Sequence, residues 1–242
     1  MEQRTTCFRT VTAATAGIPP LEATSSLEGP SRRPISVGVV DDHPIVRAGI
    51  VEFLSCEDDI HVAGEAADSV GAVDMVRTLA LDVLILDLDM PGRSGLDVLA
   101  MLRSKAPGVA VLVFTGYPAE GYAVKLLQQG AKAYLQKTCD LTELLSAIRT
   151  LSTGQRHLTP QISELLALQF DQRSRPPHAG LTDRELQVLL KLARGVRTEK
   201  IADHLALSVK TVSTYRSRLL SKLELGSNND LTYYALKHQL LE

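Results

Sequence analysis

The stretch that most constrains the fold is a short apolar run that ends on an acidic residue. Val83–Leu86 contains no polar side chain, Asp87 follows it directly, and Pro91 and Gly92 turn the chain soon afterwards. A continuous apolar run of this length is typical of a strand buried on both faces, as in a parallel sheet. Functional residues of open α/β sheets gather beyond the carboxyl ends of the strands. Asp87 is therefore a candidate functional residue, although an aspartate in this position can also simply cap the next turn.

Four more apolar runs alternate with segments of helical periodicity. Strands are predicted at residues 35–40, 61–65, 109–114 and 131–135, besides the one at 83–86. Helices are predicted at about 44–56, 69–79, 95–102, 118–130 and 140–154. Ser69 is the expected N-cap of the second helix, and Asp140 with Glu143 has the spacing of a capping box for the fifth. Ile45 and Val46 are expected to face inward from the first helix. This order predicts a five-stranded, doubly wound parallel sheet of the flavodoxin-like kind.

Polar side chains close four of the five predicted strands. Asp41 and Asp42 follow the first strand, Asp87 the third, Thr115 the fourth and Lys137 the fifth. Three carboxylates at one edge repel one another unless a cation lies among them, and hard oxygen ligands favour Mg²⁺. A carboxylate beside such an ion can attack a phosphoryl donor, whose charge a lysine and a hydroxyl then stabilise. The pattern predicts a phosphoryl-acceptor site.

Residues 35–153 resemble the receiver domain of bacterial two-component response regulators. The matching motifs are V-V-D-D-H-P at 39–44, L-D-L-D-M-P-G at 86–92, V-F-T-G at 113–116 and Y-L-Q-K at 134–137. The resemblance implies that Asp87 takes a phosphoryl group from the phosphohistidine of a sensor kinase. It also implies a Mg²⁺ site formed by Asp41, Asp42 and Asp87 with the backbone carbonyl of Asp89.

The resemblance further implies a switch pair, Thr115 and Tyr134, which rearranges when the acceptor is modified. The alternative for Tyr134, less favoured than the switch role, is an ordinary half-buried strand aromatic. Two positions depart from the common pattern. Thr138 stands where many receivers have proline after the lysine, and Asp89 is acidic, which would tune metal affinity or the lifetime of the phosphoryl group.

The last quarter of the chain has the pattern of a small helical domain. Residues 154–180 are expected to be a linker with a short helix that begins near Pro160, and residues 181–242 a second domain. Thr182 and Glu185 form a capping box, and Thr198 and Ser208 are expected to cap two further helices. The helix after Ser208 is apolar on one side and short, polar and basic on the other, which favours a helix-turn-helix. A solvated helix face would give the same spacing.

Residues 181–225 resemble the LuxR/NarL-type DNA-binding domain. The matching motifs are L-T-D-R-E-L-Q-V-L at 181–189, K-I-A-D-H-L at 200–205 and S-V-K-T-V-S at 208–213. The family's dimerisation helix would lie at about 229–240. Expected phosphate contacts come from Lys210, Thr211 and Arg218, and expected contacts to base edges from Ser213, Thr214 and Ser217. The resemblance therefore implies double-stranded promoter DNA as a partner, bound as a homodimer.

Composition agrees with a soluble protein of two domains. Hydrophobic residues make up 45% of the 242 and charged residues 22%, and no apolar window reaches the roughly 18 residues of a membrane span. Residues 1–180 carry a net charge of −5 and residues 181–242 one of +3, which suggests different partners. Cys7, Cys56 and Cys139 lack metal-ligand spacing and are interpreted as reduced thiols of a cytoplasmic protein. Residues 1–34, rich in Thr, Ser, Ala and Pro, are expected to be a disordered extension. They faintly resemble a transit peptide, and a misassigned start codon is an equal alternative.

The resulting hypothesis is a response regulator of the NarL/FixJ type, not an enzyme, in which phosphorylation of Asp87 controls dimerisation and DNA binding. A DNA-binding regulator that is controlled by protein contacts alone is one alternative. A phosphatase of the haloacid-dehalogenase type is another, because Asp87 and Asp89 resemble its paired aspartates. That family begins with the nucleophile strand and ends with the acid pair, whereas Asp41 and Asp42 come first here.

Overall fold

The computed structural model describes residues 33–90, 95–168 and 176–241. The predicted disordered extension lies almost wholly outside the described residues, as does most of the predicted turn after Met90. Residues Arg33–Glu242 form one compact unit.

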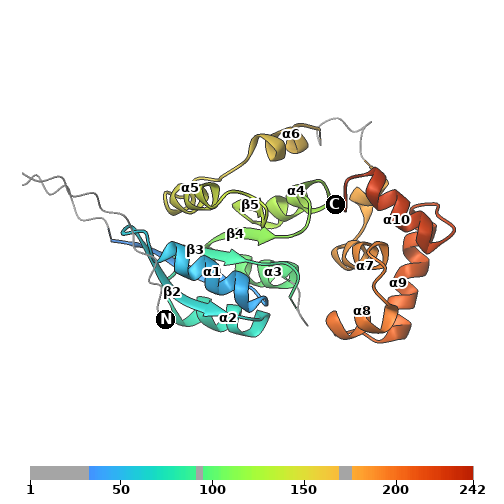
Figure 1. Cartoon of the computed structure of the whole chain (residues 1–242), viewed down its shortest axis with the longest axis horizontal. Helices are drawn as coiled ribbons and strands as arrows, with labels where there is room; N and C mark the ends of the chain where they lie inside the picture. Colours follow the sequence, from blue (N-terminus) through green and yellow to red (C-terminus); the bar gives the residue numbers. More distant parts are fainter. Residues whose placement is uncertain (1–32, 91–94, 169–175, 242) are drawn as a thin grey trace, which may run out of the picture. The chain divides into compact units, whose positions relative to one another are not determined.

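The first part of the chain is an all-parallel sheet of five strands (Figure 1). The strands run in the order β2-β1-β3-β4-β5. They are β1 (Ile35–Val40), β2 (Ile60–Ala66), β3 (Val83–Leu86), β4 (Ala110–Thr115) and β5 (Ala133–Gln136). Every described residue of β3 is buried, as the apolar run predicts. The flavodoxin-like fold is confirmed, and β3 lies in the middle of the sheet between β1 and β4.

Five helices cover the two faces of the sheet. They are α1 (Pro44–Leu54), α2 (Ser69–Thr78), α3 (Gly95–Lys105), α4 (Ala119–Gln129) and α5 (Leu141–Ser152). Alternate residues of β3 point to opposite faces. Val83 and Ile85 pack in the cluster that holds the buried residues of α1 and α5, whereas Leu84 and Leu86 pack with those of α2, α3 and α4.

Some local details differ from the sequence-based expectations. The N-cap of α2 is Asp68, whose side chain accepts hydrogen bonds from the amides of Val70 and Gly71, so Ser69 is the first helical residue. Asp140 caps α5 without a side-chain hydrogen bond, so the predicted capping box is absent. Ile45 was expected inward but is 88% exposed, because it lies in the first turn of α1, beyond the end of β1.

The second part is helical (Figure 1). Its elements are α6 (Pro160–Leu168), the 3₁₀ turn η2 (Pro177–Gly180), α7 (Asp183–Ala193), α8 (Thr198–His204), α9 (Val209–Lys222) and α10 (Asn228–Lys237). The capping box of Thr182 and Glu185 at α7 is present, and Ser208 caps α9 as predicted. Arg197, not Thr198, is the N-cap of α8. None of the described helices is long and apolar enough to cross a membrane.

Candidate functional site

The carboxyl ends of β1, β3 and β5 bring two aspartates and a lysine together. The Nζ atom of Lys137 lies 2.8 Å from Oδ2 of Asp87 and 2.8 Å from Oδ2 of Asp41. Asp87 is only 1% exposed, and its other oxygen, Oδ1, accepts hydrogen bonds from the amides of Leu88 at 2.6 Å and Asp89 at 3.3 Å. Burial raises the pKa of Asp87 against the opposing effect of Lys137. One buried carboxylate is thus held by a cation on one oxygen and by its own turn on the other.

The same edge contains a group of side chains that could hold a metal ion. Ligand atoms of Asp41, Asp42, His43 and Asp87 all lie within 4.8 Å of one another. Oδ1 of Asp42 is buried and has no hydrogen-bond partner, although Nδ1 of His43 lies 2.8 Å away. A buried oxygen without a donor fits a divalent cation, and carboxylate oxygens favour a hard one. Sequence reasoning missed His43, for which the only signal was its place directly after the acid pair.

Thr115 and Tyr134 both bind the loop between β4 and α4. Oγ1 of the buried Thr115 accepts from the amide of Tyr117 at 3.5 Å. The buried hydroxyl of Tyr134 donates to the carbonyl of Tyr117 at 2.6 Å. Tyr134 therefore points inward rather than lying half-buried on the strand. The predicted switch pair holds one loop from two sides.

A long-range contact joins Asp89 to the helical part of the chain. Its Oδ1 accepts from Nζ of Lys191 in α7 at 2.7 Å and lies 3.0 Å from Nε2 of His204 in α8. Burial alone would raise the pKa of Asp89, but the hydrogen bonds and charges of these two side chains hold it well below its usual range. The partners are more than one hundred positions away in the chain, so no local pattern could have indicated them.

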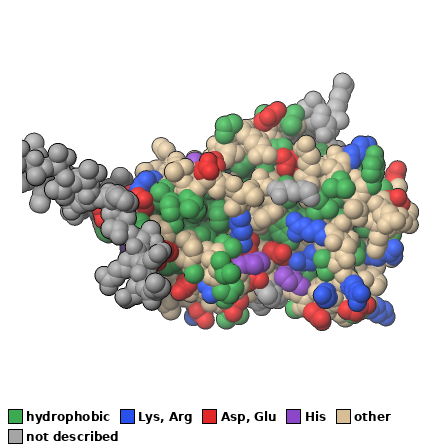
Figure 2. Space-filling model, in the orientation of Figure 1, with side chains coloured by type: hydrophobic (Ala, Val, Ile, Leu, Met, Phe, Trp, Pro, Cys, Tyr) green, Lys and Arg blue, Asp and Glu red, His purple; other side chains and the backbone are tan. Residues whose placement is uncertain are grey.

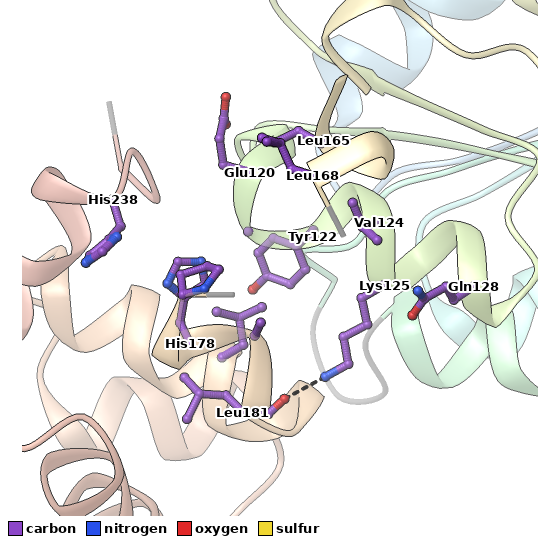
Figure 3. A pocket seen from close by; sticks show the side chains of 14 residues that line it. Glu120, Tyr122, Val124, Lys125, Gln128, Leu165, Leu168, His178, Leu181 and His238 are labelled. Atoms are coloured by element: carbon purple, nitrogen blue, oxygen red, sulfur yellow. Dashed lines mark hydrogen bonds between the residues drawn. The ribbon is translucent and has the colours of Figure 1, made fainter. Parts of the chain in front are cut away.

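Other side chains make contacts across the same junction. The guanidinium of Arg194 lies 4.8 Å from the ring centroid of Tyr117, within the range of a cation–π interaction. In the view of Figure 2, acidic, basic and histidine side chains lie close together near the middle of the visible surface. Three hydrogen bonds also cross the junction: Arg184 to Asp97 at 2.8 Å, Lys125 to the Leu181 carbonyl at 2.8 Å (Figure 3), and Gln129 to Asp183 at 2.9 Å. Lys125 forms an ion pair with Asp183 as well.

A cavity of about 270 Å³ opens above the carboxylate of Asp87. Asp87, Thr115 and Lys137 line it from the sheet, and Arg194 lines it from the helical part. Both parts of the chain therefore form the walls of the space in which a group bound to Asp87 would lie.

The predicted DNA-contacting side chains lie on one face of α9. Lys210, Ser213, Thr214, Ser217 and Arg218 are exposed, and Thr211 is half-buried. On the opposite side Val212 and Leu219 are completely buried, so the helix has the apolar and polar stripes that its sequence predicts. The positively charged pair and the small hydroxyl side chains remain accessible to a ligand.

Comparisons with known proteins agree with both parts of the chain. The model of the response regulator receiver domain matches residues 37–149, and that of the bacterial regulatory proteins of the luxR family matches residues 179–235. The response regulator UvrY of Escherichia coli is 38% identical over 208 residues, which cover 85% of this chain and 95% of UvrY. The chain is a response regulator of the LuxR type.

A second relative and two solved structures extend this assignment. The response regulator GacA of Pseudomonas aeruginosa is 36% identical and aligned over 86% of this regulator and 98% of its own length. RcsB of Salmonella typhimurium matches with a TM-score of 0.67 and 26% identity, covering 86% of this chain and 99% of RcsB. RcsB bound to promoter P1flhDC in the presence of the phosphomimetic BeF₃⁻ matches with a TM-score of 0.63, 27% identity and coverage of 83% and 97%.

The comparisons confirm the predicted family, fold and general function. This regulator belongs to a two-component system and controls transcription through its receiver and its helix-turn-helix domain. The family consists of transcription regulators rather than enzymes.

Proposed function

We propose that this regulator accepts a phosphoryl group on Asp87 from a sensor histidine kinase and that the modification frees its DNA-binding domain to dimerise on promoter DNA. The observation that carries the proposal is the buried Asp87 carboxylate, held 2.8 Å from Lys137 beside the acidic cluster. The proposed boundaries are 35–153 for the receiver, 154–180 for the linker and 181–242 for the DNA-binding domain. Promoter DNA as the ligand implies that the regulator acts in the cytoplasm.

In the proposed transfer, a carboxylate oxygen of Asp87 bonds to phosphorus as the bond from phosphorus to the kinase imidazole nitrogen breaks. Lys137, already bound to Oδ2, stabilises charge on the phosphoryl oxygens, and the hydroxyl of Thr115 offers a hydrogen bond. Asp41, Asp42 and Asp87 would hold Mg²⁺, with the backbone carbonyl of Asp89 as a further ligand. The ion, when bound, neutralises negative charge of the transferred group.

The switch follows from what Thr115 binds before modification. A phosphoryl group adds close to two negative charges and three acceptor oxygens at Asp87. If Thr115 turns its hydroxyl toward this group, the loop that carries Tyr117 moves with it. The ring of Tyr117 lies under Arg194 of the DNA-binding domain, so its movement weakens the contact between the domains.

The released domain would bind DNA through α9. Lys210, Thr211 and Arg218 are the proposed phosphate contacts, and Ser213, Thr214 and Ser217 the proposed contacts to base edges. Helix α10 carries two exposed apolar side chains, Tyr233 and Leu236, which would pair with those of a second copy. RcsB, a structural neighbour, has been seen as two dimers bound to two parallel DNAs, which supports this arrangement.

The test is the intact mass of the full chain after incubation with acetyl phosphate and Mg²⁺, followed by selection of bound fragments from genomic DNA. The wild type and an Asp58→Asn control should gain one phosphoryl group and then enrich specific fragments, whereas Asp87→Asn should do neither. Specific DNA enrichment that is equal in wild type and Asp87→Asn would favour regulation by protein contact alone. Steady hydrolysis of small phosphoesters would favour the phosphatase alternative.

A further inference from the structure

Asp89 connects the acceptor site to the DNA-binding domain through two consecutive contacts. Its amide donates to Oδ1 of Asp87 at 3.3 Å, and its carboxylate is bound by Lys191 and His204. The atoms that change on phosphorylation and the atoms that dock the second domain thus belong to the same turn of the chain. We propose that these contacts form an interdomain clamp through which the docked DNA-binding domain restrains modification of Asp87. The inference rests on the proposed function of Asp87 as the acceptor.

Within the clamp, the ion pair of Asp89 with Lys191 is the most buried of the interdomain ion pairs among the described residues, and so it has the most energetic weight. The side chain of Lys191 is 9% exposed and that of Asp89 32%, so solvent screens this pair less than it screens a surface pair. Two other direct bridges join the parts among the described residues. Arg184 and Asp97 have side chains that are 26% and 42% exposed, and Lys125 and Asp183 have side chains that are 31% and 32% exposed. Pairs as open as these contribute little to stability.

A second contact places the DNA-binding domain against the space that the phosphoryl group needs. Arg194 follows the last residue of α7, lines the cavity above Asp87 and lies over Tyr117. Lys191 precedes it by one turn of the same helix. When the domain is docked, Lys191 therefore holds Asp89, two residues after Asp87, and Arg194 narrows the cavity above Asp87.

The restraint follows from thermodynamic reciprocity. If modification of Asp87 weakens domain docking, then docking must weaken equilibrium binding of the modifying group by the same factor. Loss of the clamp should shift the population toward the undocked form, in which docking no longer weakens binding of the modifying group. The predicted effect concerns a binding equilibrium, so the suitable ligand is beryllofluoride, which binds to the acceptor carboxylate without a covalent transfer.

The experiment compares the full-length wild type with Lys191→Met/His204→Gln, which changes only the DNA-binding domain. Lys200→Met, an exposed change on α8, is the matched control. Half-saturation by beryllofluoride in excess Mg²⁺ is measured by ¹⁹F NMR, and domain release by the radius of gyration from small-angle X-ray scattering. The clamp variant should bind beryllofluoride about 5- to 20-fold more tightly and be more extended, whereas Lys200→Met should match the wild type.

The possible results separate the clamp from the acceptor. An extended clamp variant whose half-saturation equals that of the wild type would overturn the coupling, and so would a variant that remains as compact as the wild type. If neither protein binds beryllofluoride, the assignment of Asp87 fails, even if scattering shows that the variant has opened. His204→Gln alone, which changes a partly exposed side chain, should give a smaller shift in the same direction and serves if Lys191→Met does not fold.

Discussion

The hydroxyl of Tyr134 donates a hydrogen bond to the main-chain carbonyl of Tyr117, with 2.6 Å between the two oxygens. Both residues are almost completely buried, so this bond fixes the loop after β4 from inside the protein. The aromatic side chain on β5 and the loop that contacts the DNA-binding domain are therefore physically linked before any modification of Asp87.

Replacing Tyr134 by Phe should lower the free energy of unfolding by about 1–2 kcal/mol, because the carbonyl of Tyr117 loses a buried donor. Domain docking should loosen as well, since Tyr117 lies under Arg194. Denaturant unfolding measures the first effect and small-angle scattering the second. Tyr233→Phe, on an exposed side chain of α10, is the control and should change neither.

Replacing Lys137 by Met should destabilise the receiver by about 3 kcal/mol, since two buried carboxylates lose the cation that lies between them. Mg²⁺ should recover a larger part of the stability in the variant than in the wild type, because the ion supplies the missing positive charge. Thermal unfolding at several Mg²⁺ concentrations measures this difference. An equal Mg²⁺ effect on both proteins would contradict the assignment of the ion to Asp41 and Asp87.

Gly95 at the start of α3 should not tolerate a side chain. A Cβ atom there would collide with the main-chain carbonyl of Asp87, and rigid backbone cannot move away as a flexible side chain can. Gly95→Ala should therefore lower the melting temperature and reduce phosphorylation by acetyl phosphate. Gly108→Ala, where a Cβ would meet no atom within 4 Å, is the matched control.

Acid should destabilise the protein through His178, a linker residue that packs against Tyr234 of the DNA-binding domain. Burial, with a smaller contribution from His238, lowers the pKa of His178 from 6.5 to about 4. The folded state therefore holds this imidazole neutral, and its contribution to stability is complete above pH 6.5 and is lost as the pH falls toward 4. The loss amounts to at most about 3 kcal/mol. His178→Gln should show a flatter pH dependence of unfolding than the wild type, whereas the exposed His61→Gln should not.

Replacing Lys210 by Ala should weaken binding to every DNA sequence to a similar degree, because a phosphate contact carries no sequence information. The slope of log affinity against log salt should decrease by about 1. Ser217→Ala should instead change the preference among sequences and leave the salt slope unchanged. Fluorescence anisotropy at several salt concentrations, on fragments obtained from the genomic selection, distinguishes the two outcomes.

The sequence predicted most of the receiver because its signals are local. Apolar runs with a polar residue at their ends placed Asp41, Asp87 and Lys137 at one edge of a parallel sheet, where the structure brings them within hydrogen-bond distance. Some helix caps differ from the prediction because neighbouring residues compete for the same free amides. At α2, the side chain of Asp68 binds these amides, so Ser69 becomes the first residue of the helix instead of its cap. The contacts of Asp89 with Lys191 and His204 depend on tertiary packing between segments far apart in the chain, and no periodicity encodes them.

Docking engages α7 and α8, yet it leaves most of the predicted DNA-contacting side chains of α9 exposed. If α9 is the DNA-reading helix, as proposed, its surface is not hidden while the regulator waits for a signal. A single copy would then be able to touch and leave DNA in the resting state, held only by the weak electrostatic attraction that allows a protein to slide. Activation would change how long the protein stays on a site rather than whether it can reach one, so the search for promoters would begin before the signal arrives.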